Sequence, residues 1–201
     1  MNSFVEIGNM SLTHLGQGVE IASLTERSAE AKAINRVFET ARKKCLRDFK
    51  WPFATELGTA LALVASAPNT EWLFSYRYPT NCFFFRRILS GNRNERPDDE
   101  IPYRIGRDGT GLLIYTDMID ATCEYTINAT DPAKYPEDFS LALSFLVAFL
   151  IAPRVTRGDP FKLRELMWKL YQLEINNSNV NARNEEQPDI LPVDDFTAAR
   201  R

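Results

Sequence analysis

The sequence contains few of the residues on which most enzyme and metal sites depend. In 201 residues there is one histidine, His14, and there are three cysteines, Cys45, Cys82 and Cys123. The cysteines are odd in number, widely spaced and form no C-x-x-C pair, which disfavours both a zinc site and a disulfide framework. His14 has no acidic or thiol partner nearby in the sequence, so Ser-His-Asp, Cys-His and H-E-x-x-H chemistry lacks support. We therefore expect no metal, no cofactor and no enzyme activity, and we expect the cysteines to be buried apolar groups.

A positive charge excess is also missing. The chain has 24 lysines and arginines against 27 aspartates and glutamates, which gives a formal net charge of −3. Neutralising nucleic-acid phosphates normally needs clustered positive charge, so this balance argues against nucleic-acid binding as the main task. The first residues lack a basic flank followed by an apolar core, and we expect no secretory signal. The composition, 44% hydrophobic and 25% charged, is typical of a globular protein with one substantial core.

One long hydrophobic run, residues 139–152, is the most informative feature that is present. At about fourteen residues it is too short to span a bilayer, so it predicts a helix that protein buries on nearly all sides. Asp138 is placed to cap this helix and Pro153 to end it. A helix without a polar face needs many neighbours, and identical subunits could supply some of them. The run therefore favours assembly over catalysis.

Capping residues and apolar periodicity predict three further helices. Residues 4–15 form a short amphipathic pattern, and a helix of about twenty residues begins at Thr25 or Ser28, which can accept from free backbone N–H groups. Asp159 followed by Pro160 predicts another helix start. The expected inward faces are Ala31, Ile34, Phe38, Ala41, Cys45 and Phe49 on the first long helix, and Leu163, Leu166, Met167, Leu170 and Leu173 on the last. Trp168 and Tyr171 lie off the last stripe and are therefore candidates for contacts between subunits.

The middle third of the chain is predicted to be β-rich. Residues 81–89 are strand-like, and residues 101–105 and 112–116 flank a glycine-rich segment that is typical of a hairpin turn. That segment, residues 106–111, has some likeness to a phosphate-binding loop, but it lacks the Gly-Lys-Ser/Thr ending and a strand follows it instead of a helix. Residues 121–128 alternate most regularly, with Cys123, Tyr125 and Ile127 on one face and Thr122, Glu124 and Thr126 on the other.

Two charged segments admit a functional interpretation beside a structural one. Asp98, Asp99 and Glu100 lie in a polar loop that lacks the spacing of an EF-hand, so a solvated loop is favoured over a cation site. If the loop projects into a channel, these three acids would face it and repel passing DNA. Arg86 and Arg87 follow three phenylalanines, and aromatics with basic residues can bind single strands. A half-buried strand that ends at an exposed edge gives the same pattern and is favoured.

These elements predict an α+β fold, a helical bundle with an inserted β-rich region and an extended C-terminal arm. Residues 1–56 are expected to form the first part of the bundle, 57–131 the β-rich insertion, 132–182 the second part of the bundle and 183–201 the arm. The arm mixes acids with isolated apolar residues and cannot bury enough surface to fold alone. It is either a frayed tail or a segment that orders on a partner.

Several short segments along the chain form a set when they are taken in order. They are residues 21–24, Arg47 to Trp51 with Phe53-Ala54, Trp72-x-x-x-Tyr76-x-Tyr78-Pro79, the apolar run 139–152, the helix from Pro160, and the end of the arm at Asp194-Asp195-Phe196 and Ala199-Arg200. This set resembles the tail tubular protein A family of short-tailed phages, the head-to-tail adaptors that lie beneath the portal. The resemblance spans almost the whole chain. One departure follows Pro79, where the family often has an acid, cysteine, leucine and arginine and this chain has Asn81-Cys82-Phe83-Phe84.

The resemblance implies a structural protein that forms a ring of twelve copies. The ring would join the portal protein above to the tail nozzle protein below and continue the DNA channel, through which DNA passes without specific binding. Its place would be the virion, in the tail below the portal, and the host cytoplasm during assembly, without membrane contact. By the same analogy the arm is the portal-binding element, and its candidate contacts are Pro188, Ile190, Leu191, Pro192 and Phe196.

Two functions from other classes remain open as alternatives. A carboxylate-dependent hydrolase acting at cell entry would use acids such as Asp98 and Glu100, and replacing them would abolish turnover but not assembly. A nucleic-acid-binding module would use the strand 83–87, and its binding would fall steeply with salt.

Overall fold

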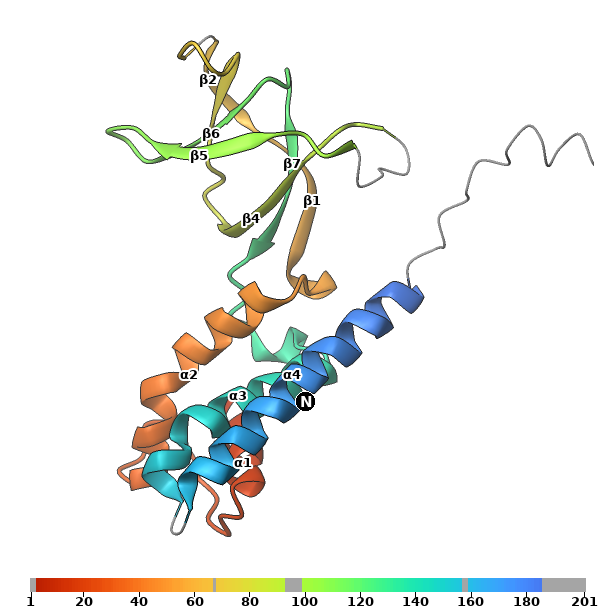
Figure 1. Ribbon diagram of the computed structural model, residues 1–201. Coiled ribbons are helices and arrows are strands. Elements are labelled where there is room, and N and C mark those ends of the chain that lie inside the picture. Colours follow the sequence, from red (N-terminus) through yellow and green to blue (C-terminus); the bar gives the residue numbers. More distant parts are fainter. Residues whose placement is uncertain (1–2, 67, 93–98, 157–158, 186–201) are drawn as a thin grey trace, which may run out of the picture.

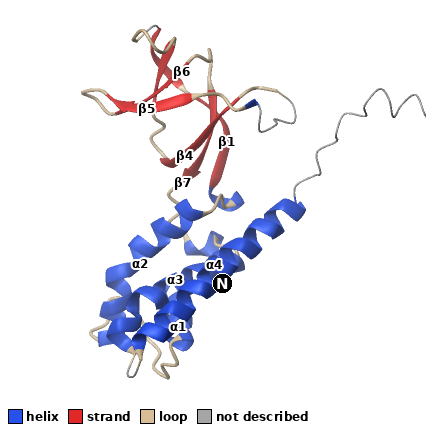
Figure 2. Ribbon diagram, viewed as in Figure 1, coloured by secondary structure: helices blue, strands red, loops and turns tan. Residues whose placement is uncertain are grey.

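The computed structural model describes residues 3–66, 68–92, 99–156 and 159–185, and the structural statements below concern these residues. They form a mixed α+β fold with two spatially distinct parts, one of helices and one of strands (Figures 1 and 2). All described strands come between the second and third α-helices in the sequence, so the chain enters and leaves the β-rich part once. The α+β class is confirmed.

The helical part is organised around α3 (Glu137–Val155), which contacts each of the other three described α-helices. Those are α1 (Phe4–His14), α2 (Ala29–Asp48) and α4 (Pro160–Glu185). Fully buried side chains from several helices form its hydrophobic core, among them Leu12, Ile34, Leu143 and Ile151. α4 passes residue 183, the position at which the sequence predicts the C-terminal arm to begin.

The helix starts at Ser28 and Asp159 are confirmed. The Ser28 hydroxyl accepts from the Ala31 N–H at 3.2 Å, which caps α2. The Asp159 carboxylate accepts from the N–H groups of Phe161 and Lys162, and α4 begins at Pro160, which has no N–H to satisfy. Short-range capping chemistry therefore decides where both helices begin.

The predicted limits of the apolar helix are wrong. α3 begins at Glu137 with Pro136 at the N-cap position, so Asp138 lies in the first turn and caps nothing. Pro153 lies inside the helix, which continues for two residues to Val155. Proline lacks the N–H group, so Pro153 removes one backbone hydrogen bond from the last turn of α3. The helix ends two residues later.

At 19 residues, α3 is long and apolar enough to cross a membrane by length and composition, contrary to the expectation that it is too short. The core helix of a globular protein passes the same test. Here most of its side chains, including Phe139, Leu146 and Val147, are buried against the other helices. Figure 1 shows α3 lying among α1, α2 and α4.

The β-rich part contains two antiparallel sheets. The strands are β1 (Thr55–Ala60), β2 (Ala62–Ser66), β3 (Phe74–Arg77), β4 (Cys82–Leu89), β5 (Tyr103–Arg107), β6 (Leu112–Thr116) and β7 (Thr122–Ile127). One sheet has the strand order β1-β7-β4 and the other the order β2-β3-β6-β5. The four predicted strand segments are confirmed, whereas β1, β2 and β3 were not predicted as strands. A second core, which includes Tyr76, Phe85, Ile88, Ile114 and Cys123, lies within this part.

Two arginines join the helical part to the strands. Arg86 on β4 donates to the carbonyl oxygens of Leu46 and Phe49, at 3.0 and 2.9 Å, where α2 ends. Arg42 on α2 is 1% exposed and donates to the Ala129 carbonyl and to Asn128 Oδ1, beyond the end of β7. These bonds fix the C-terminal half of α2 against β4 and against the segment that follows β7. Neither role was visible in the sequence.

Candidate interaction surfaces

The described residues include apolar surface that the core leaves uncovered, and the clearest instance is on α4. Leu166, Leu173 and Val180 are 48%, 55% and 57% exposed. They are spaced by seven residues, which is close to two helical turns, so they form one line along the helix. We name these three residues the outer stripe. The sequence placed Leu166 and Leu173 on the inward face, and that prediction is wrong.

The buried face of α4 includes Met167 and Tyr171, which are 3% and 0% exposed. The Tyr171 hydroxyl donates to Asp48 Oδ2 at 2.8 Å, and the ring lies 5.5 Å from that of Trp168. Burial is the main cause that raises the pKa of the Tyr171 phenol. Tyr171 was predicted to contact another subunit. The structure corrects this prediction, because the Tyr171 side chain is fully buried and its hydroxyl has an acceptor, Asp48, inside the chain.

Trp168 remains a candidate for subunit contacts, because it lies at a shallow surface groove of about 440 Å³. We name this feature the aromatic groove. The Trp168 and Phe149 rings are 5.2 Å apart, and Phe161 is 72% exposed. Lys44 lies 5.7 Å from the centre of the Trp168 ring. The residues that line the aromatic groove are Lys44, Phe149, Phe161, Arg164, Glu165 and Trp168.

Of the charged residues that line the aromatic groove, Lys44 and Glu165 form ion pairs, whereas Arg164 forms none with a described residue. Lys44 pairs with Asp48 at 2.6 Å, and Glu165 pairs with Lys169 at 2.7 Å. Arg164 stacks its guanidinium 4.5 Å from the centre of the Phe149 ring, and it has no ion pair with any described residue. Its Nε atom is buried without a hydrogen-bond acceptor. Buried polar groups are nearly always hydrogen-bonded, so an unsatisfied donor such as Arg164 Nε is unusual.

The candidate channel residues are only partly described. Asp98 lies outside the described residues, Asp99 is half-buried and Glu100 is exposed. A single chain defines no channel, so their role stays a prediction. The candidate portal contacts Pro188, Ile190, Leu191, Pro192 and Phe196 also lie outside the described residues.

Arg86 and Arg87 are engaged within the chain rather than presented to a nucleic acid. Arg87 Nε lies 2.5 Å from Glu124 Oε2, and Lys50 Nζ lies 2.6 Å from Glu124 Oε1. Glu124 is 1% exposed. Burial alone would raise the pKa of this carboxyl, but hydrogen bonds from Lys50 and Arg87 outweigh it and lower the pKa. With Arg86 bound to the end of α2, these contacts agree with the half-buried strand that the sequence favours.

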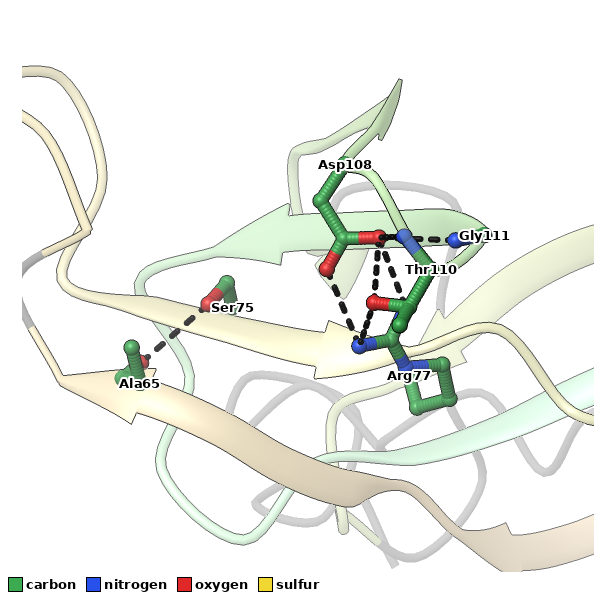
Figure 3. Close-up of polar contacts among 6 residues, drawn as sticks. All are labelled: Ala65, Ser75, Arg77, Asp108, Thr110 and Gly111. Atoms are coloured by element: carbon green, nitrogen blue, oxygen red, sulfur yellow. Dashed lines mark hydrogen bonds and ion pairs between the residues drawn. The ribbon is translucent and has the colours of Figure 1, made fainter.

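The glycine-rich segment is a hairpin turn between β5 and β6, as predicted (Figure 3). The Asp108 carboxylate accepts from the N–H groups of Thr110 and Gly111 at 2.8 and 2.7 Å, and Arg77 binds it at 3.0 Å. The Arg77 guanidinium holds the pKa of Asp108 well below its usual range. Asp108 thus takes the backbone donors that a bound phosphate would need, which explains the likeness without a phosphate site.

The histidine and the cysteines occupy structural positions. The His14 ring lies 3.0 Å from Ser144 Oγ and stacks on Phe145, and burial lowers its pKa. Cys45 and Cys123 are buried as expected, and burial raises the pKa of the Cys123 thiol to about 12. Cys82 is only half-buried, so the expectation is wrong for this residue. In the described part of the chain, no group of three or more His, Cys, Asp or Glu could hold a metal ion.

Three hollows lined by described residues each include at most one acid. Besides the aromatic groove, one of about 210 Å³ includes Asp138 and one of about 290 Å³ includes no carboxylate. Glycosidase-type hydrolysis needs two carboxylates a few ångströms apart. These hollows therefore lend no support to a carboxylate-dependent hydrolase.

Comparison with known proteins leaves the family undecided. No protein-family model matches the chain, and a search of curated proteins found no match. The resemblance to phage head-to-tail adaptors, with the ring, partners and location that it implies, therefore remains a prediction.

Proposed function

We propose that this protein is a structural head-to-tail adaptor of a phage virion. Copies form a ring between the portal protein and the tail nozzle protein, and the ring continues the DNA channel. In this proposal the four helices form the bundle and the two sheets protrude from it. The observation that carries the proposal is the outer stripe of α4, because it supplies apolar surface for contacts between copies.

The outer stripe favours a protein partner for physical reasons. Fully burying a leucine or valine side chain contributes about 1.5–3 kcal/mol, and each stripe residue keeps roughly half of its surface in water. Three such side chains in line on one helix offer a row that a neighbouring subunit can cover. Single exposed apolar residues need no such explanation, but a row with helical spacing does.

Polar contacts inside the chain join the helical part to the β-rich part. Arg42, Arg86 and Glu124 are each held by several groups of the same chain. Their contacts join α2 and the segment that follows it to the β-rich part. A firm connection between the two parts suits a protein that transmits position and symmetry.

Contacts between different surfaces of neighbouring copies either close into a ring or continue into a filament. A template with fixed symmetry selects the ring, and in this proposal the portal is that template. The ring of twelve, the portal and the nozzle come from the family resemblance. The resemblance also assigns the arm, residues 183–201, to the portal.

Native mass spectrometry of the purified protein, with and without portal, tests the proposal. We expect a ring on the portal, and we expect the double variant Leu166→Ser/Leu173→Ser to reduce ring formation. Ile119→Ser is the matched control, because Ile119 is 65% exposed in the β-rich part, away from α4. A protein that remains a single chain on assembled portal would refute the adaptor function.

A further inference from the structure

The aromatic groove combines three features that call for a particular kind of ligand. Its walls are the rings of Phe149, Phe161 and Trp168, and Phe161 is largely exposed. Arg164 adds a positive charge with no ion-pair partner among the described residues, and its buried Nε–H lacks an acceptor. A segment that presents an aromatic ring next to a carboxylate would pack against these rings and pair with the Arg164 guanidinium.

The chain itself contains such a ligand. Asp194, Asp195 and Phe196 follow one another near the C-terminus, and they lie outside the described residues. Two carboxylates beside one phenylalanine match a groove with an unpaired arginine and aromatic walls. We propose that the aromatic groove binds the segment Asp194-Asp195-Phe196 of a second copy of this chain. This contact deepens the adaptor function proposed above, and rests on it, because it names one join between copies in the ring.

Chain length favours a second copy over the same chain. Arg164 and Glu185 are 21 positions apart on α4, which is about 32 Å along a helix. Ten further residues lead from Glu185 to Asp195, and they span about 33–36 Å only when fully extended. The segment of the same chain would reach Arg164 only by running straight back along α4. A neighbouring copy has no such restriction.

The contact has a consequence for the arm. It assigns Phe196 to a neighbouring copy and leaves Pro188, Ile190, Leu191 and Pro192 as candidate portal contacts. A segment of one copy that binds the groove of the next is a contact between unlike surfaces, which is the kind that closes a ring.

The first test measures binding of a fluorescently labelled peptide, residues 186–201, to the full-length protein by anisotropy. We expect binding that Arg164→Glu weakens about tenfold or more, which corresponds to about 1.4 kcal/mol. Arg104→Glu is the matched control, because Arg104 is an exposed arginine on β5 with one surface ion pair, and this variant should bind normally. No binding, or equal loss in both variants, would overturn the proposal.

A charge exchange separates a direct contact from damage to the fold. The peptide with Asp194→Arg and Asp195→Arg should bind the Arg164→Glu variant better than it binds the wild-type protein. If it binds neither, or prefers the wild type, Arg164 does not contact these acids. Peptide binding requires no ring, so this result stands apart from a failure to assemble on the portal.

The second test identifies which chain supplies the segment. Isotope-labelled and unlabelled protein are mixed before assembly and treated with a carbodiimide, which joins the Lys44 amine to a carboxylate as an amide and takes up the water that is lost. We expect mass spectrometry to find Lys44 joined to Asp194 or Asp195 in pairs of mixed label. Pairs of a single label only, or a link from Lys44 to an acid of the portal, would overturn the assignment to a second copy.

Discussion

Replacing Tyr171 with alanine should destabilise the protein far more than replacing Leu173 with alanine. Both residues lie on α4, two positions apart, but Tyr171 is 0% exposed and Leu173 is 55% exposed. The first change empties a site in the core of the helical part, whereas the second removes atoms that are already largely in water. The pair therefore reports which face of α4 packs inward.

The magnitudes follow from the contacts of each side chain. Truncating a buried aromatic residue to alanine costs about 3–5 kcal/mol. Tyr171 also donates to Asp48, which keeps its ion pair with Lys44, so no buried charge loses its last partner. We expect a loss of about 4 kcal/mol for Tyr171→Ala and about 1–2 kcal/mol for Tyr171→Phe, which removes the hydroxyl alone. For Leu173→Ala we expect about 0.5 kcal/mol, as for most surface substitutions.

Urea unfolding followed by far-ultraviolet circular dichroism measures these free energies. The protein concentration is kept low enough that the protein stays monomeric, so that unfolding is measured without assembly. An m-value that does not change between variants shows that a shift of the midpoint reports a change in stability. At higher concentrations Leu173→Ala should instead weaken association. A loss above about 2 kcal/mol for Leu173→Ala, with a smaller loss for Tyr171→Ala, would refute the assignment of the two faces.

Three further predictions concern polar groups that are buried or half-buried. Arg42→Met should cost about 2–3 kcal/mol, because Ala129 and Asn128 lose a charged donor, whereas Lys43→Met at an exposed site should cost less than about 0.5 kcal/mol by urea unfolding. Because the folded pKa of His14 is lowered, the wild type should lose stability as pH falls below 6.5, and His14→Phe should remove this part of the thermal-denaturation profile. The folded pKa of Glu124 is also lowered, so ionised Glu124 should stabilise the fold above pH 4.5, and this contribution should be lost as pH falls through the folded pKa. If Glu124→Gln loses as much stability on acidification as the wild type, this prediction is contradicted.

The sequence identified the elements better than their faces. Ser28 and Asp159 cap helices where predicted, and the glycine-rich hairpin lies between its two expected strands. The stripe predicted on α4 was wrong, because leucines occur on both sides of that helix and periodicity alone cannot say which side has partners. The aromatic groove was missed because Lys44, Phe149 and Arg164 come from three helices that only packing brings together.

The sequence by itself determined the α+β class, the starts of α2 and α4, and the glycine-rich hairpin between β5 and β6. Those features depend on capping, turn chemistry and periodicity, which act between residues a few positions apart. Only the tertiary structure decided that Tyr171 is buried, that Arg42 joins α2 to the end of β7, and that Leu173 faces outward. Each of these outcomes depends on which distant groups meet in space, and burial or exposure of a side chain is set by those neighbours rather than by its own residue type.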